Sequence, residues 1–271
     1  VRSFGLWVEQ LIAESTGKEG KGIIPVAGEP LASPGHYGND RFFVYLRLKT
    51  DDNSSIDVAI KAIRASGQPV IILEMADKYD LGAEFFRWEL ATAVAGYVIG
   101  INPFNQPNVQ QAKDATERFL KAFSSLATYL PPLEGTGLLR DLLTKAVPGR
   151  YFAIMVYLPQ TPSMDEALTQ LRQKVMERYH IATTLGYGPR FLHSTGQLHK
   201  GGTNSGLFLQ LTASHQTDVP IPGVPYTFGN VADAQALGDR EALRANGREV
   251  ASVRLPAANA ASVKQLLAEV C

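Results

Sequence analysis

The sequence has almost no cysteine, no excess of either charge and no long apolar run. Its one cysteine is Cys271, so an internal disulfide and a paired-cysteine metal or redox site are both excluded. The 26 basic residues equal the 26 acidic residues in number. Such a balance gives no overall field that would gather nucleic acid or an anionic membrane. A small anionic ligand would therefore need a local site.

The sequence also lacks targeting and membrane signals. No apolar run approaches the roughly 18 residues that span a bilayer, and the amino terminus lacks the pattern of a secretory signal. We therefore expect a cytoplasmic protein with no membrane and no nucleic-acid partner. The chain begins at Val1 without an initiator methionine, which favours a chain cut from a longer polypeptide.

Short β-prone stretches alternate with helical ones along the chain. Apolar spacing predicts helices over residues 4–14, 54–66, 81–98, 109–127, 163–179, 231–246 and 260–270, with one more short helix inside the loop 135–148. It predicts strands over residues 41–48, 69–75, 151–157, 181–185, 207–212 and 249–255, and a glycine- and histidine-rich turn after residue 185. The run 151–157 is apolar throughout, as in a central strand covered on both faces. The alternation predicts one doubly wound α/β domain over residues 1–271, built on a parallel sheet.

Polar residues concentrate in five segments at the predicted ends of these elements, where an open α/β sheet holds its ligands. The segments are residues 13–18, 28–41, 74–80, 102–107 and 190–204. The first is not a phosphate loop, because Glu19 follows the lysine and Ile12 stands where that loop needs glycine. On this pattern alone, Glu14 is either a solvated carboxylate at a helix end or a catalytic base.

The cluster at residues 193–202 contains two of the five histidines, a lysine and three glycines. Glycine allows a close backbone approach to a ligand, histidine transfers protons near neutral pH, and lysine holds negative charge. A zinc site at His193 and His199 lacks a third ligand at a recognisable spacing. A structural, glycine-rich turn with a solvated Lys200 stays open.

The remaining segments have simpler interpretations. Residues 102–107 are predicted to form a loop made rigid by its prolines, and residues 74–80 a solvated connection. Asp40 and Arg41 are predicted to pair either with each other or with a substrate.

Four motifs in a fixed order carry a family resemblance. They are ESTGK at residues 14–18, GEP at 28–30, NPFNQP at 102–107 and QLHK at 197–200. With the longer strings 5–18 and 188–202, this order resembles the second half of glucose-6-phosphate isomerases over nearly the whole chain. It is most similar to the isomerase part of bacterial bifunctional transaldolase/glucose-6-phosphate isomerases. The resemblance implies a sugar isomerase (SIS) fold, a flavodoxin-like three-layer α/β/α arrangement with about five parallel strands.

The resemblance also implies an activity: glucose 6-phosphate and fructose 6-phosphate are interconverted without a metal or an organic cofactor. In this family a glutamate matching Glu14 moves the proton between C1 and C2 through a cis-enediolate, and a lysine matching Lys200 assists ring opening and charge stabilisation. The family's ring-opening histidine aligns with Asp40, which is a departure. His36, His193 or His199 could substitute, and His199 is the first choice because it adjoins Lys200.

Other residues of these motifs are expected to bind the substrate: Lys18, Asp40, Arg41, His193 and Gln197. The family's phosphate-gripping loop and an arginine near the enediolate belong to a preceding half that this chain does not contain. We therefore expect the chain to need that amino-terminal SIS half as a partner, with a fused transaldolase and a homodimer as further expectations. Two alternatives remain: a non-catalytic sugar-phosphate-binding or regulatory module, and a structural domain that supports a transaldolase.

Overall fold

The computed structural model describes residues 3–125 and 137–270. In this part of the chain the strands are all parallel and form two sheets. The larger sheet has the order β4-β3-β5-β6, and the smaller one pairs β1 with β2. The strands are β1 (Phe43–Leu48), β2 (Val70–Met75), β3 (Tyr151–Val156), β4 (Ala182–Tyr187), β5 (Gly206–Ala213) and β6 (Glu249–Leu255). The predicted parallel α/β architecture is confirmed, although its strands are divided four and two instead of forming one sheet of about five.

The helices follow the predicted alternation. They are α1 (Phe4–Thr16), α2 (Ser54–Ala65), α3 (Leu81–Ile99), α4 (Val109–Ser125), α5 (Leu138–Leu143), α6 (Pro162–Tyr179), α7 (Ser194–Gly201), α8 (Phe228–Ala245) and α9 (Ala260–Gln265). The end of the helix predicted over residues 109–127, and Cys271, lie outside the described residues. Helix α8 begins three residues earlier than predicted, because Thr227 and Asn230 form a reciprocal capping box at its start.

The prediction of a turn in the histidine-rich segment is wrong, because residues 194–201 form helix α7. The glycines that suggested a turn serve close packing instead. A Cβ atom at Gly196 would lie 1.6 Å from the carbonyl oxygen of Phe191. Glycine is therefore required in this helix by its neighbours and not by a turn.

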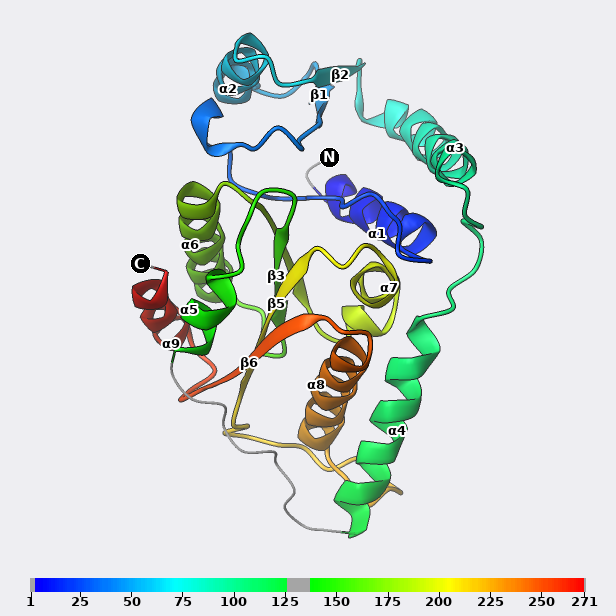
Figure 1. Ribbon diagram of the computed structural model, residues 1–271, viewed down its shortest axis with the longest axis vertical. Coiled ribbons are helices and arrows are strands. Elements are labelled where there is room, and N and C mark those ends of the chain that lie inside the picture. Colours follow the sequence, from blue (N-terminus) through cyan, green and yellow to red (C-terminus); the bar gives the residue numbers. More distant parts are fainter. Residues whose placement is uncertain (1–2, 126–136, 271) are drawn as a thin grey trace.

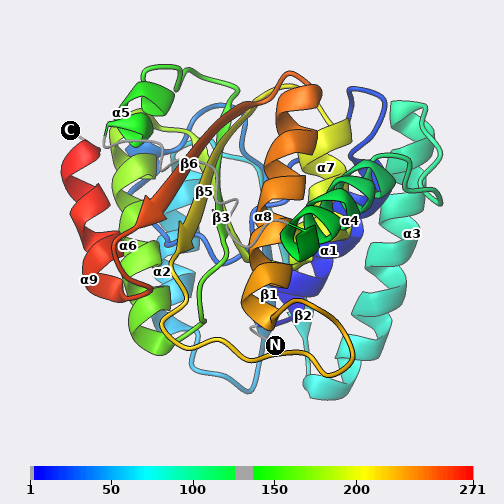
Figure 2. The ribbon, with the colours of Figure 1, turned by 90° about the horizontal axis from the view of Figure 1, so that it is seen from below.

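The larger sheet is the middle layer of a three-layer arrangement. Helices α5, α6 and α9 lie on one face, and α7 and α8 lie on the other (Figures 1 and 2). Alternate residues of β3 serve the two layers: Phe152 and Ile154 join the core beneath α6, whereas Ala153 and Met155 face Phe191. Every residue of β3 is buried, so its prediction as the central strand is confirmed.

Helices α1 and α4 lie outside the layer that α7 and α8 form. Helix α1 packs on α7, and α4 packs on α8. The smaller sheet, with α2 and α3, lies at the opposite end of the molecule from α8 (Figure 1). The chain therefore brings α1 and the loop between α3 and α4 to the outer side of α7.

Candidate functional site

Three of the predicted polar segments meet at helix α7. The buried side chain of Gln197 donates hydrogen bonds from Nε2 to the carbonyl oxygen of Gly17 (2.8 Å) and to Oδ1 of Asn108 (2.9 Å). It also accepts one at Oε1 from the backbone N–H of Asn108 (2.9 Å). This group is called here the α7 junction, and its members are Glu14, Gly17, Lys18, Asn105, Gln106, Asn108 and Gln197.

Glycine makes the close approach of α1 and α7 possible. A Cβ atom at Gly17 would lie 2.3 Å from Cα of Leu198, a separation that packed atoms do not adopt. The backbone N–H of Gly20 donates to the carbonyl oxygen of Gly201 (2.9 Å). The glycines of the motif ESTGKEG thus serve to join two helices.

Glu14 and Lys18 extend from this connection toward the loop between α3 and α4. The half-buried carboxylate of Glu14 accepts a hydrogen bond from the side-chain amide of Gln106. The buried ammonium of Lys18 donates to the backbone oxygen of Asn105 and to its Oδ1 (3.3 Å). Burial lowers the pKa of Lys18, and the negative charges of Glu14 and Glu19 oppose that shift. The loop between α3 and α4 therefore holds both the negatively charged Glu14 and the positively charged Lys18.

Lys200 lies on the same helix but points into the protein. Its ammonium lies 2.5 Å from Oδ1 of Asp239 and donates a second hydrogen bond to the carbonyl oxygen of Phe191 (2.7 Å). Both charged side chains are fully buried. Tyr157 donates its hydroxyl to the other carboxylate oxygen of Asp239, and burial with this carboxylate raises the pKa of Tyr157. None of these contacts involves Glu14.

His199 lies inside an aromatic cluster. Its ring centroid is 4.9 Å from that of Phe208, 5.8 Å from Phe191 and 6.4 Å from Tyr151. Burial, together with the positive charges of Lys200, Arg190 and Arg248, lowers the pKa of His199 to about 3. The imidazole is therefore neutral at physiological pH. These surroundings give no support to its predicted role as ring-opening acid, which stays a prediction.

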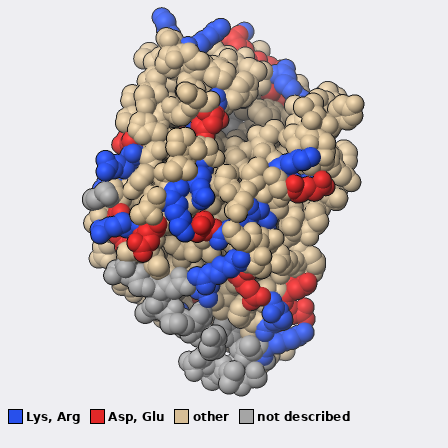
Figure 3. All heavy atoms as spheres, in the orientation of Figure 1, with Lys and Arg blue, Asp and Glu red and all other residues tan. Residues whose placement is uncertain are grey.

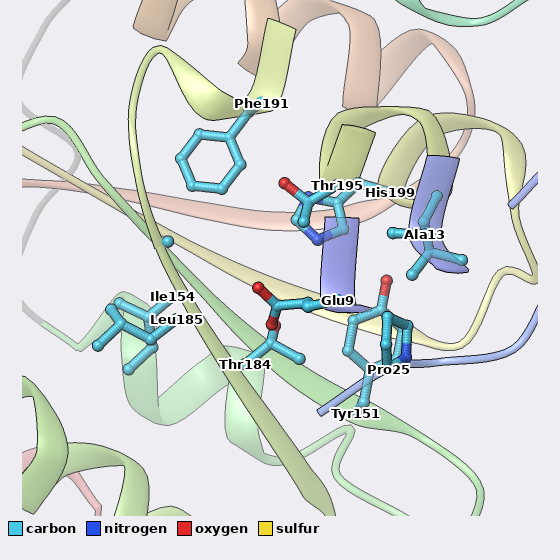
Figure 4. Close-up of a pocket in the computed structure, with 12 residues that line it drawn as sticks. Glu9, Ala13, Pro25, Tyr151, Ile154, Thr184, Leu185, Phe191, Thr195 and His199 are labelled. Atoms are coloured by element: carbon cyan, nitrogen blue, oxygen red, sulfur yellow. The ribbon is translucent and has the colours of Figure 1, made fainter. Parts of the chain in front are cut away.

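Glu9 is a buried carboxylate that the sequence analysis missed. It lines a cavity of about 10 Å³ with Thr184, Thr195 and His199 (Figure 4). Arg190 approaches it to 2.8 Å. Burial raises the pKa of Glu9 to about 6, because desolvation outweighs the opposing effects of Arg190, Arg172 and the backbone of Ala27. The sequence does contain a signal for the burial of Glu9: this residue directly follows Val8, within the apolar pattern of α1.

Asp40 and Arg41 lie away from the α7 junction. Arg41 pairs with Glu29 (3.8 Å) and Asp40 (3.7 Å). Glu29 in turn accepts hydrogen bonds from the backbone N–H (2.7 Å) and hydroxyl (2.9 Å) of Thr183. Because Thr183 is near the start of β4, the segment 28–41 lies at the amino ends of the strands, not at the carboxyl ends where ligands were expected.

The same segment borders a cleft of about 800 Å³. The cleft is walled by α1, α3, β1 and the starts of β3 and β4, and Figure 3 shows the surface hollowed beside the smaller sheet. Asp40 and Arg41 line it, whereas Glu14, Lys18 and Gln197 do not. His193 is exposed at the start of α7. Ring nitrogen Nδ1 of His36 lies 3.2 Å from the carbonyl oxygen of Glu177.

The described residues contain neither a group of metal ligands nor a membrane-spanning helix. Across residues 3–125 and 137–270, no three side chains of histidine, cysteine, aspartate or glutamate are grouped so that they could hold a metal ion. No helix in that part of the chain is long and apolar enough to cross a membrane.

Comparison with known proteins identifies relatives. No family model matches the chain. Glucose-6-phosphate isomerase from Leptospira biflexa is 32% identical over 41% of this chain and 34% of its own length. The enzymes of the same name from Lactobacillus delbrueckii and Enterococcus faecalis are 30% and 31% identical, over 42% and 41% of this chain and 33% and 32% of their own lengths. The chain thus spans about a third of the length of the curated relatives that it matches.

A search of solved structures finds a weak likeness. A hypothetical protein from Thermus thermophilus, TT0462, matches 99% of this chain and 74% of its own, with a TM-score of 0.41 and 15% identity. That likeness is too weak to support an argument. The sequence matches are stronger, and they relate the chain, over about two fifths of its length, to the glucose-6-phosphate isomerase family.

Proposed function

We propose that the chain supplies the base-bearing half of an isomerase site that interconverts glucose 6-phosphate and fructose 6-phosphate, with Glu14 as the base. The observation that carries this proposal is the α7 junction, where motifs from three distant parts of the sequence meet beside the Glu14 carboxylate. The names of the relatives support a sugar-phosphate isomerase in general.

The proposed chemistry is a proton transfer between neighbouring carbons. Glu14 takes the proton from C2 of the open-chain aldose, and the C1 carbonyl oxygen becomes the charged oxygen of a cis-enediolate. The hydroxyl proton then passes from O2 to O1, Glu14 returns the carbon proton to C1, and C2 becomes the ketone carbonyl. The side-chain amide of Gln106 orients the carboxylate. Negative charge developing on the enediolate is best stabilised by preorganised donors. Lys18, which is anchored to Asn105, is the cation among the residues of the junction, and we assign it that purpose.

The rest of the site is proposed to come from outside this chain. Lys200 and His199 are turned into the interior, so their roles in ring opening stay predictions. We propose that an amino-terminal SIS half supplies the donors for the substrate phosphate, because a phosphate needs several charge-assisted hydrogen bonds. A fused transaldolase, a second subunit and a cytoplasmic location also stay predictions.

The test compares two carboxylate variants in the complete natural polypeptide that carries these residues. Glu14→Gln keeps the size of the side chain and removes the base, so kcat for fructose 6-phosphate should fall about 10²-fold or more with KM little changed. Glu19→Gln is the matched control, because it removes an exposed carboxylate from the segment that directly follows α1. Glucose 6-phosphate formation is followed with a coupled dehydrogenase. Equal activity of the two variants would exclude Glu14 as the base.

A second candidate function is a non-catalytic module that binds sugar phosphates. The interior position of Lys200 and His199 favours it, since a sensor needs no proton-transfer groups beside Glu14. Under this alternative the complete polypeptide binds fructose 6-phosphate in calorimetry without isomerising it.

A further inference from the structure

Helix α3 exposes an apolar face to solvent. Only three of its 19 residues are charged, and a helix that is apolar on nearly all sides is normally buried on all of them. In the described part of the chain α3 packs mainly on α1, and it lies at the edge of the molecule (Figure 2). Its uncovered side is called here the α3 face. The members of this face are between 53% and 87% exposed, and they are Phe86, Leu90, Val94, Tyr97 and Val98.

The spacing of these residues makes the α3 face one continuous stripe. Four of its members recur at intervals of four residues, and Tyr97 follows Val94 by three, so all five share one side of the helix. On the other side, the ring of Phe85 contacts the rings of Phe4 and Trp7 in α1. The α3 face is therefore turned away from α1.

Helix α4 shows what an outer helix of this protein looks like when solvent covers it. Its exposed residues include Lys113, Asp114, Glu117 and Arg118, as expected for a helix with one buried side. The apolar surface of α3 is therefore not a general property of the outer helices of the chain. Contiguous exposed apolar patches of this kind mark interaction sites.

The area of the α3 face suits a contact between proteins. Because a large aromatic side chain carries about 150–250 Å², the five members leave on the order of 600 Å² in solvent at these exposures. The largest apolar patch on a typical monomer is about 300–600 Å², and each partner in a stable interface buries roughly 800 Å². Ala83 and Ala91, which are also exposed on α3, enlarge the patch. The face is thus large enough to form the centre of a dimer contact.

The charges around the α3 face allow it to meet an identical face. Arg87 and Glu89 flank the face near its amino end, and Arg87 already pairs with Glu84 (2.8 Å). In a two-fold symmetric contact the same patch lies on both partners. A charged centre would therefore repel its own copy, whereas this uncharged centre does not.

We propose that the α3 face is the contact between two copies of this chain, which pack helix against helix about a two-fold axis. Burial of the apolar side chains drives the association, and the flanking charges stay at the rim of the contact, in solvent. The pairing does not depend on the isomerase proposal, because it uses none of the residues assigned to that site.

Sedimentation velocity should show dimers at micromolar concentration, both for the 271-residue chain and for the complete natural polypeptide. Leu90→Glu puts two like charges in the middle of the contact and should weaken dimerisation by at least about 100-fold. Its circular dichroism should match that of the parent, because Leu90 is exposed. Val58→Glu, at an exposed apolar position of α2, is the matched control and should stay dimeric.

Opposite charges at the same position test whether the face meets its own copy. Leu90→Lys alone should be monomeric for the same reason as Leu90→Glu. An equimolar mixture of the two variants should form a mixed dimer, because unlike charges then lie across the contact. A misfolded variant, or a face that binds a different protein, would show no such recovery.

Three results would overturn the proposal. A monomeric complete polypeptide would exclude the pairing, and if the 271-residue chain alone dimerised, another part of that polypeptide would be what covers α3. A dimer that survives Leu90→Glu would place the contact elsewhere on the surface. Absence of a mixed dimer would mean that the face does not meet its own copy. Failure of Glu14→Gln to change isomerisation affects none of these outcomes, so the two proposals fail separately.

Discussion

Helix α7 carries two polar groups that are built in opposite ways. Gln197, on its outer side, is a neutral amide that joins Gly17 to Asn108, and the charged Glu14 lies at the partly exposed rim of that junction. Three residues further on, Lys200 is a full charge paired with Asp239 in the dehydrated interior. Closeness in the sequence therefore does not mean that two residues share a function. Gln197 and Lys200 are three residues apart on one helix, yet their side chains lie in different environments.

The difference shows which of these groups are free for chemistry. A buried charge must keep its partner, because separating the two leaves an uncompensated charge in a medium of low dielectric constant. A carboxylate at a half-exposed rim can gain or lose a proton without disrupting the fold. We therefore expect substitutions of Lys200 to act mainly on stability, and substitutions of Glu14 mainly on activity.

The largest effect should come from breaking the interior pair. Lys200→Met keeps the length of the side chain but leaves the Asp239 carboxylate buried without its cation, so the free energy of unfolding should fall by about 3–5 kcal/mol. Urea unfolding followed by circular dichroism measures it. Lys61→Met, at an exposed position of α2, is the control and should change that free energy by less than about 0.5 kcal/mol.

A double variant sharpens this result. Asp239→Asn added to Lys200→Met removes the stranded charge and leaves an amide oxygen that still accepts the Tyr157 hydroxyl. The double variant should therefore be more stable than Lys200→Met alone. If it were less stable by the sum of the two single effects, the lysine and aspartate would not act as a pair.

A smaller loss should follow from crowding the outer side of α7. In Gly17→Ala the new methyl group would meet the backbone of Leu198, and we expect a loss of about 3 kcal/mol, at the upper end of the usual range for overpacking. Gly82→Ala is the control: it lies in α3 with open space around it, and alanine there should keep or slightly raise stability. The same urea titrations compare the two, and equal effects would contradict the close contact of α1 with α7.

The sequence predicts the elements of this fold well, because apolar periodicity and capping act locally. Strand β3 is apolar throughout, and it is the buried central strand. Asn259, a residue type that favours helix N-caps, precedes α9, and its side chain accepts the backbone N–H of Ser262 (2.9 Å). Residues 194–201 were mistaken for a turn because glycine lowers helix propensity, while the contact of Gly196 with Phe191 that requires it is visible only in three dimensions.

The candidate site is predictable only in part. Motif order assigned Glu14, Lys18 and Gln197 to one site. In the structure each of them bonds to the segment between α3 and α4, at Gln106, Asn105 and Asn108 respectively, and their shared role stays a prediction. Motif order could not separate them from Lys200, whose partner Asp239 lies 39 residues further along the chain. It also could not reveal the cleft, because the walls of the cleft come from α1, α3, β1 and the starts of β3 and β4.

The smallest expected effect concerns Glu9, whose contribution to the free energy of unfolding depends on pH. Burial raises the pKa of Glu9 from 4.5 to about 6, so between these values the folded state binds this proton more tightly than the unfolded state does. The contribution of Glu9 to stability is then fully present below pH 4.5 and is lost as the pH rises through 6, with a total change of about 2 kcal/mol.

Urea unfolding of the parent and of Glu9→Gln at several pH values isolates this contribution, because the effects of the other carboxylates cancel in the difference. That difference should fall with rising pH and level off above about pH 7. A difference that rises over the same window would mean that Arg190, 2.8 Å away, outweighs desolvation, and that this interior carboxylate is a paired charge like Asp239.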